Sequence, residues 1–336
     1  MRALMLVAML LAGMAAPVAA DDAVVVKALR NPVDKSYRKM VKGMVLFDAM
    51  HAMAPEASLR YKLLPRKRDT DMSGIELRIV GDSFELPIAL AADQTFTLER
   101  QRKALDEDAS VRPNRKADSM TWRAEVRTPG LPAHTRRLGD LRLECRVGME
   151  AGLVSHYPSF FGRLMSVLED PRDFCNERNV PYLFFAERPL FGVTLSAGAR
   201  KEVLSVGQLY AGIAHGRAPV NELSYCDCEA LLDRAYFLPL GERSWPDETL
   251  VELEYMDTAA PADEAADAVL GGHSTKADVI AVLGEGRVVH FDNGFEVRAY
   301  QFGEQKPRLR ETELVVLFDP SGSVAKTRLR PALPPG

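Results

Sequence analysis

The sequence predicts an α+β protein with a large, antiparallel β-rich N-terminal region and a small C-terminal domain of two helices and an antiparallel sheet. Short apolar or alternating runs dominate the first two thirds of the chain, and helical apolar spacing is confined to a few segments. The 336 residues are 47% hydrophobic, with 43 Lys+Arg against 47 Asp+Glu. This composition excludes disordered, collagen-like and coiled-coil proteins.

The first twenty residues have the three-part pattern of a Sec signal peptide. Arg2 carries the one charge, an apolar run follows, and the small residues Val18-Ala19-Ala20 precede Asp21. The run is shorter than the roughly 20 apolar residues of a membrane-spanning helix. We therefore expect residues 1–20 to be a signal peptide that is cleaved after Ala20, and the protein to be periplasmic. No Cys stands at the cleavage point, so lipidation is not expected.

The remaining chain predicts neither a nucleic-acid partner nor a transmembrane anchor. The formal net charge is −4 and no long basic run occurs, so the sequence lacks the electrostatic footprint of a protein that binds nucleic acid or anionic membranes. No later segment is long and apolar enough to span a bilayer.

The predicted export makes the four cysteines candidates for disulfide bonds, because thiols in an oxidising compartment usually pair. The disulfide candidates are Cys145, Cys175, Cys226 and Cys228. In the favoured arrangement, Cys145 and Cys175 each pair with one member of the Cys226/Cys228 couple. In the alternative, Cys226 bonds Cys228 in a strained, easily reduced ring that would mark a redox-active C-x-C. Partial pairing and metal binding are further alternatives.

The mature chain begins with an amphipathic helix within residues 34–51. Its apolar residues recur at helical spacing after a capping-type Asp34 or Ser36. Residues 59–147 then predict an antiparallel sheet, and the polar segment 101–118 predicts a long exposed loop. The expected strands are 59–64, 75–80, 84–91, 95–98, 120–126 and 141–147.

A helix is expected at residues 159–168, because its apolar residues fall on one stripe. A short helical or irregular segment carries Cys226 and Cys228. Residues 256–261 open an acidic, Ala-rich stretch that we interpret as a linker between regions 21–255 and 262–336. Further strands are expected at 182–186, 191–196, 201–204 and 250–255.

Residues 262–330 predict two helices followed by four strands. Thr275 with Asp278 forms a capping box, and Gly284 ends that helix. Turn signals at Asp292-Asn293-Gly294 and Asp319-Pro320-Ser321-Gly322 each separate two strands. We expect residues 262–336 to fold on their own. The expected strands are 287–291, 295–302, 312–318 and 324–328.

The same segment carries a recognisable residue pattern. It consists of Ser274-Thr275-Lys276-Ala277-Asp278-Val279, Leu283-Gly284, Asn293-Gly294 with Tyr300, and 313–319 followed by Gly322 and Val324. This pattern resembles the SmpA/OmlA family, the small outer-membrane assembly lipoproteins also called BamE. The resemblance implies a periplasmic interaction module. It assigns no ligand or partner residues, and the family's lipidated N-terminal Cys has no counterpart here.

No residue set predicts a catalytic, cofactor-binding or metal site. Ser36-Tyr37-Arg38-Lys39 matches S-x-x-K but is better explained as a helix start, because no companion S-x-N or K-T-G triplet occurs. The calcium-loop opening at Asp69 fails at its twelfth position, Val80, and predicts an acidic turn. Trp122 and Trp245 are expected to be core or hairpin residues rather than platforms for a ligand. The six histidines are scattered: His51, His134, His156, His215, His273 and His290.

The favoured function is that of a non-enzymatic envelope binding or assembly factor with an envelope protein as its partner. The alternative is a periplasmic enzyme, either a thiol oxidoreductase that uses Cys226 and Cys228 or a hydrolase whose site is assembled from distant residues. No cofactor is implied.

Overall fold

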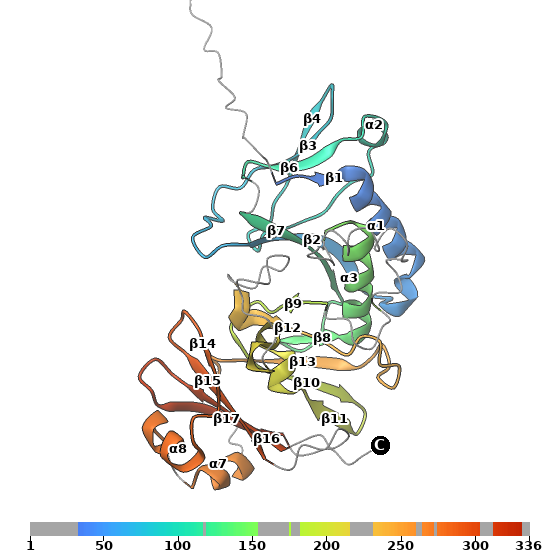
Figure 1. Cartoon of the computed structure of the whole chain (residues 1–336). Helices are drawn as coiled ribbons and strands as arrows, with labels where there is room; N and C mark the ends of the chain where they lie inside the picture. The colour runs from blue at the N-terminus through green and yellow to red at the C-terminus, as the bar shows by residue number, and fades with distance from the viewer. Residues whose placement is uncertain are drawn as a thin grey trace, which may run out of the picture.

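The computed structural model describes residues 33–116, 119–153, 175, 182–215, 231–259, 264–271, 274–302 and 312–330. The chain forms an elongated molecule whose N-terminal sheets and C-terminal sheet lie at opposite ends (Figure 1). It combines helices with antiparallel sheets, so the predicted α+β class is confirmed. None of the described helices has the length and apolar character that crossing a bilayer requires. The predicted signal peptide and the helix at 159–168 lie outside the described residues.

The N-terminal part has a three-stranded sheet of order β5-β2-β7 and a four-stranded sheet of order β1-β6-β3-β4. Helices α1 and α3 pack together, and α3 packs against β7 (Figure 1). The elements are β1 (Lys35–Ser36), α1 (Tyr37–Ala49), β2 (Ser58–Pro65), β3 (Leu77–Val80), β4 (Glu85–Ile88), β5 (Thr95–Phe96), α2 (Arg102–Asp106), β6 (Ser110–Pro113), β7 (Met120–Arg127) and α3 (Leu138–Glu150).

Helix α1 confirms the prediction for residues 34–51, and Ser36 is its N-cap. The Ser36 hydroxyl accepts a hydrogen bond from the backbone N–H of Lys39. Gly43 allows α1 to approach α3 closely, because a Cβ there would lie 2.9 Å from the Cβ of Ala151. The S-x-x-K tetrapeptide is thus a helix start, as the sequence predicts.

The predicted strand at 141–147 is wrong, since these residues belong to helix α3. Apolar residues occur at every second position in this segment, as in a strand: Leu141, Leu143, Cys145 and Val147. They do so because two opposite sides of the helix are buried in different cores. Leu138, Leu141, Cys145 and Met149 follow helical spacing into the central core. Leu143, Val147 and Ala151 follow the same spacing into the N-terminal core.

The predicted exposed loop at 101–118 is also wrong. It contains α2 and β6, and β6 lies between β1 and β3 in the sheet. Ala104, Ala109 and Val111 are buried. Because β6 is only four residues long, its pattern of inward and outward side chains is too short to stand out in a polar sequence.

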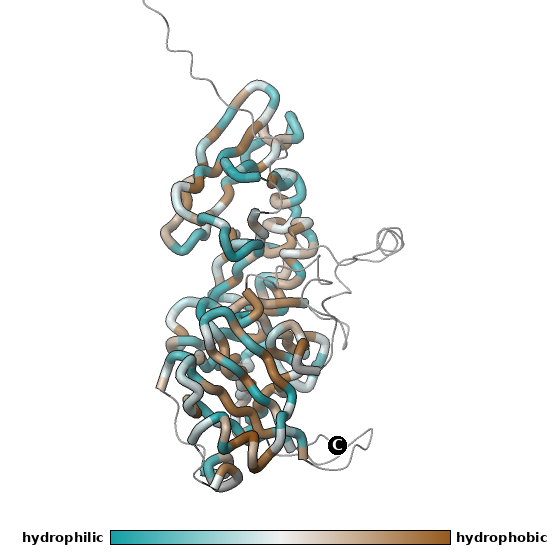
Figure 2. Tube along the Cα trace, turned by 60° about the vertical axis from the view of Figure 1, so that its left-hand side comes forward, coloured by the Kyte–Doolittle hydropathy of each residue, from teal (hydrophilic) through white to brown (hydrophobic). Residues whose placement is uncertain are grey.

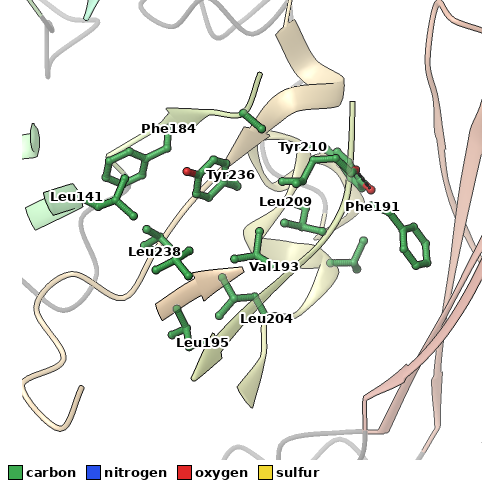
Figure 3. Packing of buried hydrophobic residues seen from close by; sticks show 14 of the residues in the cluster. Leu141, Phe184, Phe191, Val193, Leu195, Leu204, Leu209, Tyr210, Tyr236 and Leu238 are labelled. Carbon is green, nitrogen blue, oxygen red and sulfur yellow. Dashed lines mark hydrogen bonds between the residues drawn. The ribbon is translucent and has the colours of Figure 1, made fainter. Parts of the chain in front are cut away.

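The central part is built on a four-stranded sheet of order β11-β10-β13-β8, with β9 and β12 paired beside it. Apolar side chains from these strands and from α3 converge in one core (Figure 3). The strand predicted at 250–255 is confirmed with its bounds. Of the strand predicted at 182–186, only Phe184–Phe185 is a strand in the structure. The elements are β8 (Thr135–Arg137), β9 (Phe184–Phe185), β10 (Leu190–Ala197), β11 (Arg200–Val203), β12 (Ala235–Tyr236) and β13 (Leu250–Tyr255), with 3-10 helices η1 (His51–Met53), η2 (Val206–Gln208), η3 (Tyr210–His215) and η5 (Leu232–Arg234).

The C-terminal part has two helices and a sheet of order β14-β15-β16-β17, in agreement with the predicted elements. The Thr275 cap, the helix end at Gly284 and the turn at Gly294 occur where the sequence predicts them. The elements are α7 (Glu264–Leu270), α8 (Lys276–Leu283), β14 (Arg287–His290), β15 (Glu296–Phe302), β16 (Thr312–Phe318) and β17 (Val324–Arg330).

Both faces of this C-terminal sheet are buried. One face packs against α7 and α8 through Tyr300, Leu314, Val316 and Phe318. The other face packs against the central core. Phe191 of β10 belongs to this core and points toward the C-terminal sheet (Figure 3). Hydrophobic stretches accordingly concentrate in the lower half of the molecule, where the two sheets meet (Figure 2). The residues on this second face and its flanking strand are Val289, Val297, Ala299, Val315 and Leu317.

Two buried cations of β17 also fix the sheet to the central part. The Lys326 ammonium donates to the backbone oxygen of Tyr255 at 2.5 Å and to Glu254 at 3.2 Å. The Arg328 guanidinium donates to the backbone oxygen of Phe191 at 3.1 Å. Gly192 provides the space, because a Cβ there would lie 2.4 Å from Nη1 of Arg328.

The predicted linker begins inside the folded structure. Met256 is buried, and its N–H donates to the backbone oxygen of Pro189. Residues 260 and 261 lie outside the described part of the chain. The domain boundary therefore stays a prediction.

The structure contains a disulfide between Cys145 of α3 and Cys175, whose Cα atoms are 6.1 Å apart. The favoured pairing of these two residues with Cys226 and Cys228 is therefore wrong. Four cysteines allow three connectivities, and spacing alone does not choose among them. Cys226 and Cys228 lie outside the described residues.

The Cys145–Cys175 bond closes a loop with a sequence separation of 30 residues. The chain-entropy relation assigns about 3.5 kcal/mol to a loop of this length. We expect the double variant Cys145→Ala/Cys175→Ala to lose about that much free energy of unfolding, measured by urea denaturation. Peptide mapping without reduction should find the two cysteines in one linked species. Unchanged stability, or a peptide that links Cys145 to Cys226 or Cys228, would contradict the assignment.

Residues 262–336 expressed alone would expose the sheet face that the central core covers. We expect this fragment to bind a hydrophobic dye and to self-associate, because burial of such a face drives association. Size-exclusion chromatography and dye fluorescence measure both effects, and the full chain is the control. A monomeric fragment that melts cooperatively without dye binding would show that the face against α7 and α8 suffices for folding.

Candidate ligand-binding cleft

A cleft of about 600 Å³ separates the three-stranded N-terminal sheet from β9 and Arg234, the last residue of η5. In Figure 1, β2 and β7 lie above β9. We call it the charged cleft, because acidic and basic side chains from both walls line it. These are Lys62, Asp93, Arg123, Glu125, Arg127, Arg136, Glu144, Glu187 and Arg234.

Strand β7 provides one wall through its alternation. Trp122, Ala124 and Val126 enter the N-terminal core, so Arg123, Glu125 and Arg127 project from the opposite face. Such a face usually meets solvent. Here β9 and its neighbours cover it, and Arg123 and Glu125 are each only 9% exposed.

Cationic side chains make contacts both within one wall of the charged cleft and between its walls. Within the β2–β7 wall, Glu125 lies 3.4 Å from both Lys62 Nζ and Arg127 Nε. Arg127 Nη2 reaches across to Glu187 Oε1 at 2.6 Å. The Arg123 guanidinium stacks over the Phe185 ring, 5.1 Å from its centroid.

A buried ion pair lies at the inner end of the cleft. Arg136 Nη2 donates to Glu144 Oε2 at 2.7 Å and to the backbone oxygen of Val126 at 2.8 Å. Burial raises the pKa of Glu144, and Arg136 opposes this shift. Burial disfavours the charge of Arg136, but Glu144 outweighs it and raises the pKa of the guanidinium. Each charge is thus kept in the interior by the other.

Several polar atoms in the cleft are buried without a hydrogen-bond partner in the described structure. They include the donors Nε of Arg136 and Nε of Arg234, and the acceptor Oε1 of Gln94. Buried polar groups nearly always have partners. The cleft therefore offers both donors and acceptors to a polar occupant.

The residues singled out from sequence lie elsewhere. The Cys145–Cys175 bond belongs to the central core, and Trp122 and Trp245 are buried as predicted. Asp71 accepts hydrogen bonds from Ser73, which confirms a local turn. The lining residues that the structure describes include no His, Cys, Ser or Thr.

The described histidines occupy separate places. His51 bonds the backbone oxygen of Ala57, His134 packs on Tyr255, and His290 lies 3.1 Å from Glu296. His156 and His273 fall outside the described residues, and His215 lies in η3. Within the described ranges, no three potential metal ligands cluster. The distant-residue site considered for a hydrolase is not assembled by these three rings.

Sequence reasoning missed the charged cleft, although one signal was present. In the strand at 120–126, apolar residues alternate with Thr121, Arg123 and Glu125. This alternation predicts that the polar face of the strand is exposed to solvent. The covering wall comes from residues more than fifty positions later, so nothing local reveals it.

Comparisons with protein-family models, curated proteins and solved structures give no match for this chain. The resemblance of the C-terminal segment to the SmpA/OmlA family stays a hypothesis.

The Arg136–Glu144 pair generates a prediction about stability. Arg136→Met or Glu144→Leu alone should lower the free energy of unfolding by about 3–5 kcal/mol, because each leaves one buried charge without its partner. The double variant should cost less than the sum of the single changes by about 2 kcal/mol or more. Urea denaturation at pH 7 measures the cycle. Additive losses would show that the two charges do not depend on each other.

Proposed function

We propose that this protein is an exported, non-enzymatic binding or assembly factor of the cell envelope, which holds an extended segment of a partner protein in the charged cleft. The observation that carries the proposal is a set of polar atoms in this cleft that are buried without a hydrogen-bond partner among the described residues. A peptide backbone supplies both kinds of group at short intervals. It could satisfy Gln94 with an N–H and Arg136 or Arg234 with a carbonyl oxygen.

The charge balance of the cleft supports a polypeptide rather than a simple ion. Its lining has five basic and four acidic side chains, and several are already paired with one another. A free anion or cation would meet both attraction and repulsion there. Leu64, Met72 and Phe184 add apolar surface for side chains of the segment.

Export is supported by two independent features. The N-terminal residues follow the signal-peptide pattern. The Cys145–Cys175 disulfide suits an oxidising compartment, where such bonds persist. The SmpA/OmlA resemblance supports an envelope partner for the C-terminal part.

Selection from a phage library of linear twelve-residue peptides tests the proposal. The full chain should enrich peptides whose binding weakens about fivefold or more in Gln94→Asn and in Arg234→Lys. Asn suits the left-handed backbone of Gln94, where φ is 63°, but retracts the acceptor. Lys keeps the charge of Arg234 but removes Nε. Gln94→Asn therefore removes a contact to a ligand with little effect on the fold, whereas Arg234→Lys also removes the 2.9 Å hydrogen bond from Arg234 Nη1 to the backbone oxygen of Glu187.

Arg102→Lys is the matched control, because the Arg102 side chain on α2 is 95% exposed and lies away from the cleft. Selected peptides should bind this variant as tightly as the unaltered protein. Failure to enrich any peptide, or equal binding by all variants, would overturn the proposal.

A thiol oxidoreductase is the second candidate function. The Cys145–Cys175 bond favours it, because this bond leaves neither residue to pair with Cys226 or Cys228. Among the four cysteines, Cys226 and Cys228 are left to pair with each other, to react with another molecule or to remain thiols. Their two thiols would become a disulfide while the disulfide of a substrate is reduced to two thiols. A Cys226–Cys228 bond found by the same peptide mapping, and reduced at mild potential, would support this candidate.

A further inference from the structure

Helix α8 in the C-terminal part is more apolar than its burial explains. Six of its eight residues are apolar. A helix that is hydrophobic on all sides is normally buried, whereas a helix at the protein surface normally has a polar outer side. In α8 only Val279 is buried. The other apolar residues are Ala277, Ile280, Ala281, Val282 and Leu283.

Contacts with the C-terminal sheet account for only the inner side of α8. Val279 packs in a cluster with Tyr300 and Leu314 of the sheet, and Leu283 borders this cluster. Helix α7 contributes Ala266 to the same cluster, so the two helices lie side by side on one face of the sheet (Figure 1). The opposite side of α8 faces away from these contacts.

The outer side of α8 consists of two adjoining rows of exposed residues. Ala277 and Ala281 are four positions apart, so they lie one above the other on the helix. Asp278 and Val282 form the second row in the same way, and Val282 is 53% exposed. We call the area formed by Ala277, Ala281 and Val282 the α8 surface.

Exposed carboxylates lie around the α8 surface. Asp278 adjoins it on the same helix, Glu285 follows the end of α8, and the neighbouring helix α7 carries Glu264 and Asp267. Among the described cations, none forms an ion pair with Glu264, Asp267 or Asp278. The sequence shows the same bias, because residues 244–275 contain no Lys or Arg.

The cations of this region do not neutralise the carboxylates. Lys276 at the start of α8 pairs with Glu296 at 2.9 Å. The Arg298 guanidinium is shared between Glu296 at 2.6 Å and Glu285 at 2.7 Å. Even when the exposed Arg287 at the start of β14 is counted, carboxylates outnumber cations around α8. The α8 surface is therefore an apolar area with an acidic rim.

The charge of the rim selects among the possible occupants of the α8 surface. An anionic lipid surface would be repelled by the carboxylates. A second copy of this chain that packed α8 against α8 would bring two acidic rims together, which is unfavourable. A partner segment that carries Lys or Arg beside apolar side chains would be attracted both by the rim and by the apolar area.

We propose that the α8 surface binds a basic amphipathic helix of a partner protein. The apolar side of that helix packs on Ala277, Ala281 and Val282, and the two small alanine side chains let its backbone approach α8 closely. Its Lys or Arg residues pair with the carboxylates of the rim. This surface is separate from the charged cleft, whose described lining residues all precede the C-terminal part.

Binding of a model peptide to the full chain tests this proposal. The probe is a fluorescently labelled amphipathic peptide of leucine and lysine at helical spacing, and binding is measured by fluorescence anisotropy. The control peptide has glutamate in place of lysine. We expect saturable binding of the leucine–lysine peptide that weakens as salt is added, because salt screens the rim, and no binding of the control peptide.

A matched pair of valine substitutions locates the binding. Val282→Lys should weaken binding of the leucine–lysine peptide about fivefold or more, because it removes apolar contact and adds a charge that repels the peptide. Val45→Lys is the control, since Val45 is 56% exposed on α1. Both changes are at exposed helix positions where Lys is a better helix former than Val, so both variants should fold.

Several results would contradict the proposal. One is the absence of binding, and another is equal binding by Val282→Lys and Val45→Lys. Attachment to phosphatidylglycerol vesicles that Val282→Lys abolishes would assign the surface to lipid, and a dimer that the same change dissociates in sedimentation would assign it to a second copy. The peptide selection for the charged cleft depends on Gln94 and Arg234, so either site can fail its test without the other.

Discussion

Helix α3 is buried along nearly its whole length, and the charges it carries must therefore find partners inside the protein. This constraint connects the main features of the molecule. Glu144 pairs with Arg136 at the inner end of the charged cleft, and Arg142 pairs with Asp247. Cys145 anchors the disulfide on the same helix. Displacing α3 would alter the charged cleft and separate the two cores that it joins.

The C-terminal sheet is integrated into the fold by a comparable mixture of apolar and charged contacts. Val297 and Val315 extend the central core, and Lys326 is buried against Glu254 and a backbone oxygen. Burying a cation in this way costs free energy unless its hydrogen bonds are made, so the interface has little tolerance for displacement. If the C-terminal part does act as an interaction module, its free surface is the outer side of α7 and α8 together with the sheet edges, not a sheet face.

Local signals in the sequence predicted local structure well. The Ser36 cap, the Thr275 cap and the turn at Gly294 depend on hydrogen bonds and backbone angles within a few residues, and all occur as predicted. The errors arose where distant parts of the chain decide. Residues 141–147 alternate because two cores flank one helix, and Cys145 pairs with Cys175 because of where α3 lies. The ion pair between Arg142 and Asp247 could not be predicted for the same reason, since the two residues are 105 positions apart.

Charge balance determines what the charged cleft can hold. In the charged cleft, Lys62, Arg127 and Arg136 each lie beside a carboxylate, so an added ion would have to compete with an existing partner. What the cleft lacks is hydrogen-bond partners, which a neutral backbone supplies. A peptide segment can therefore meet the unfilled hydrogen bonds of the cleft without displacing any of its ion pairs.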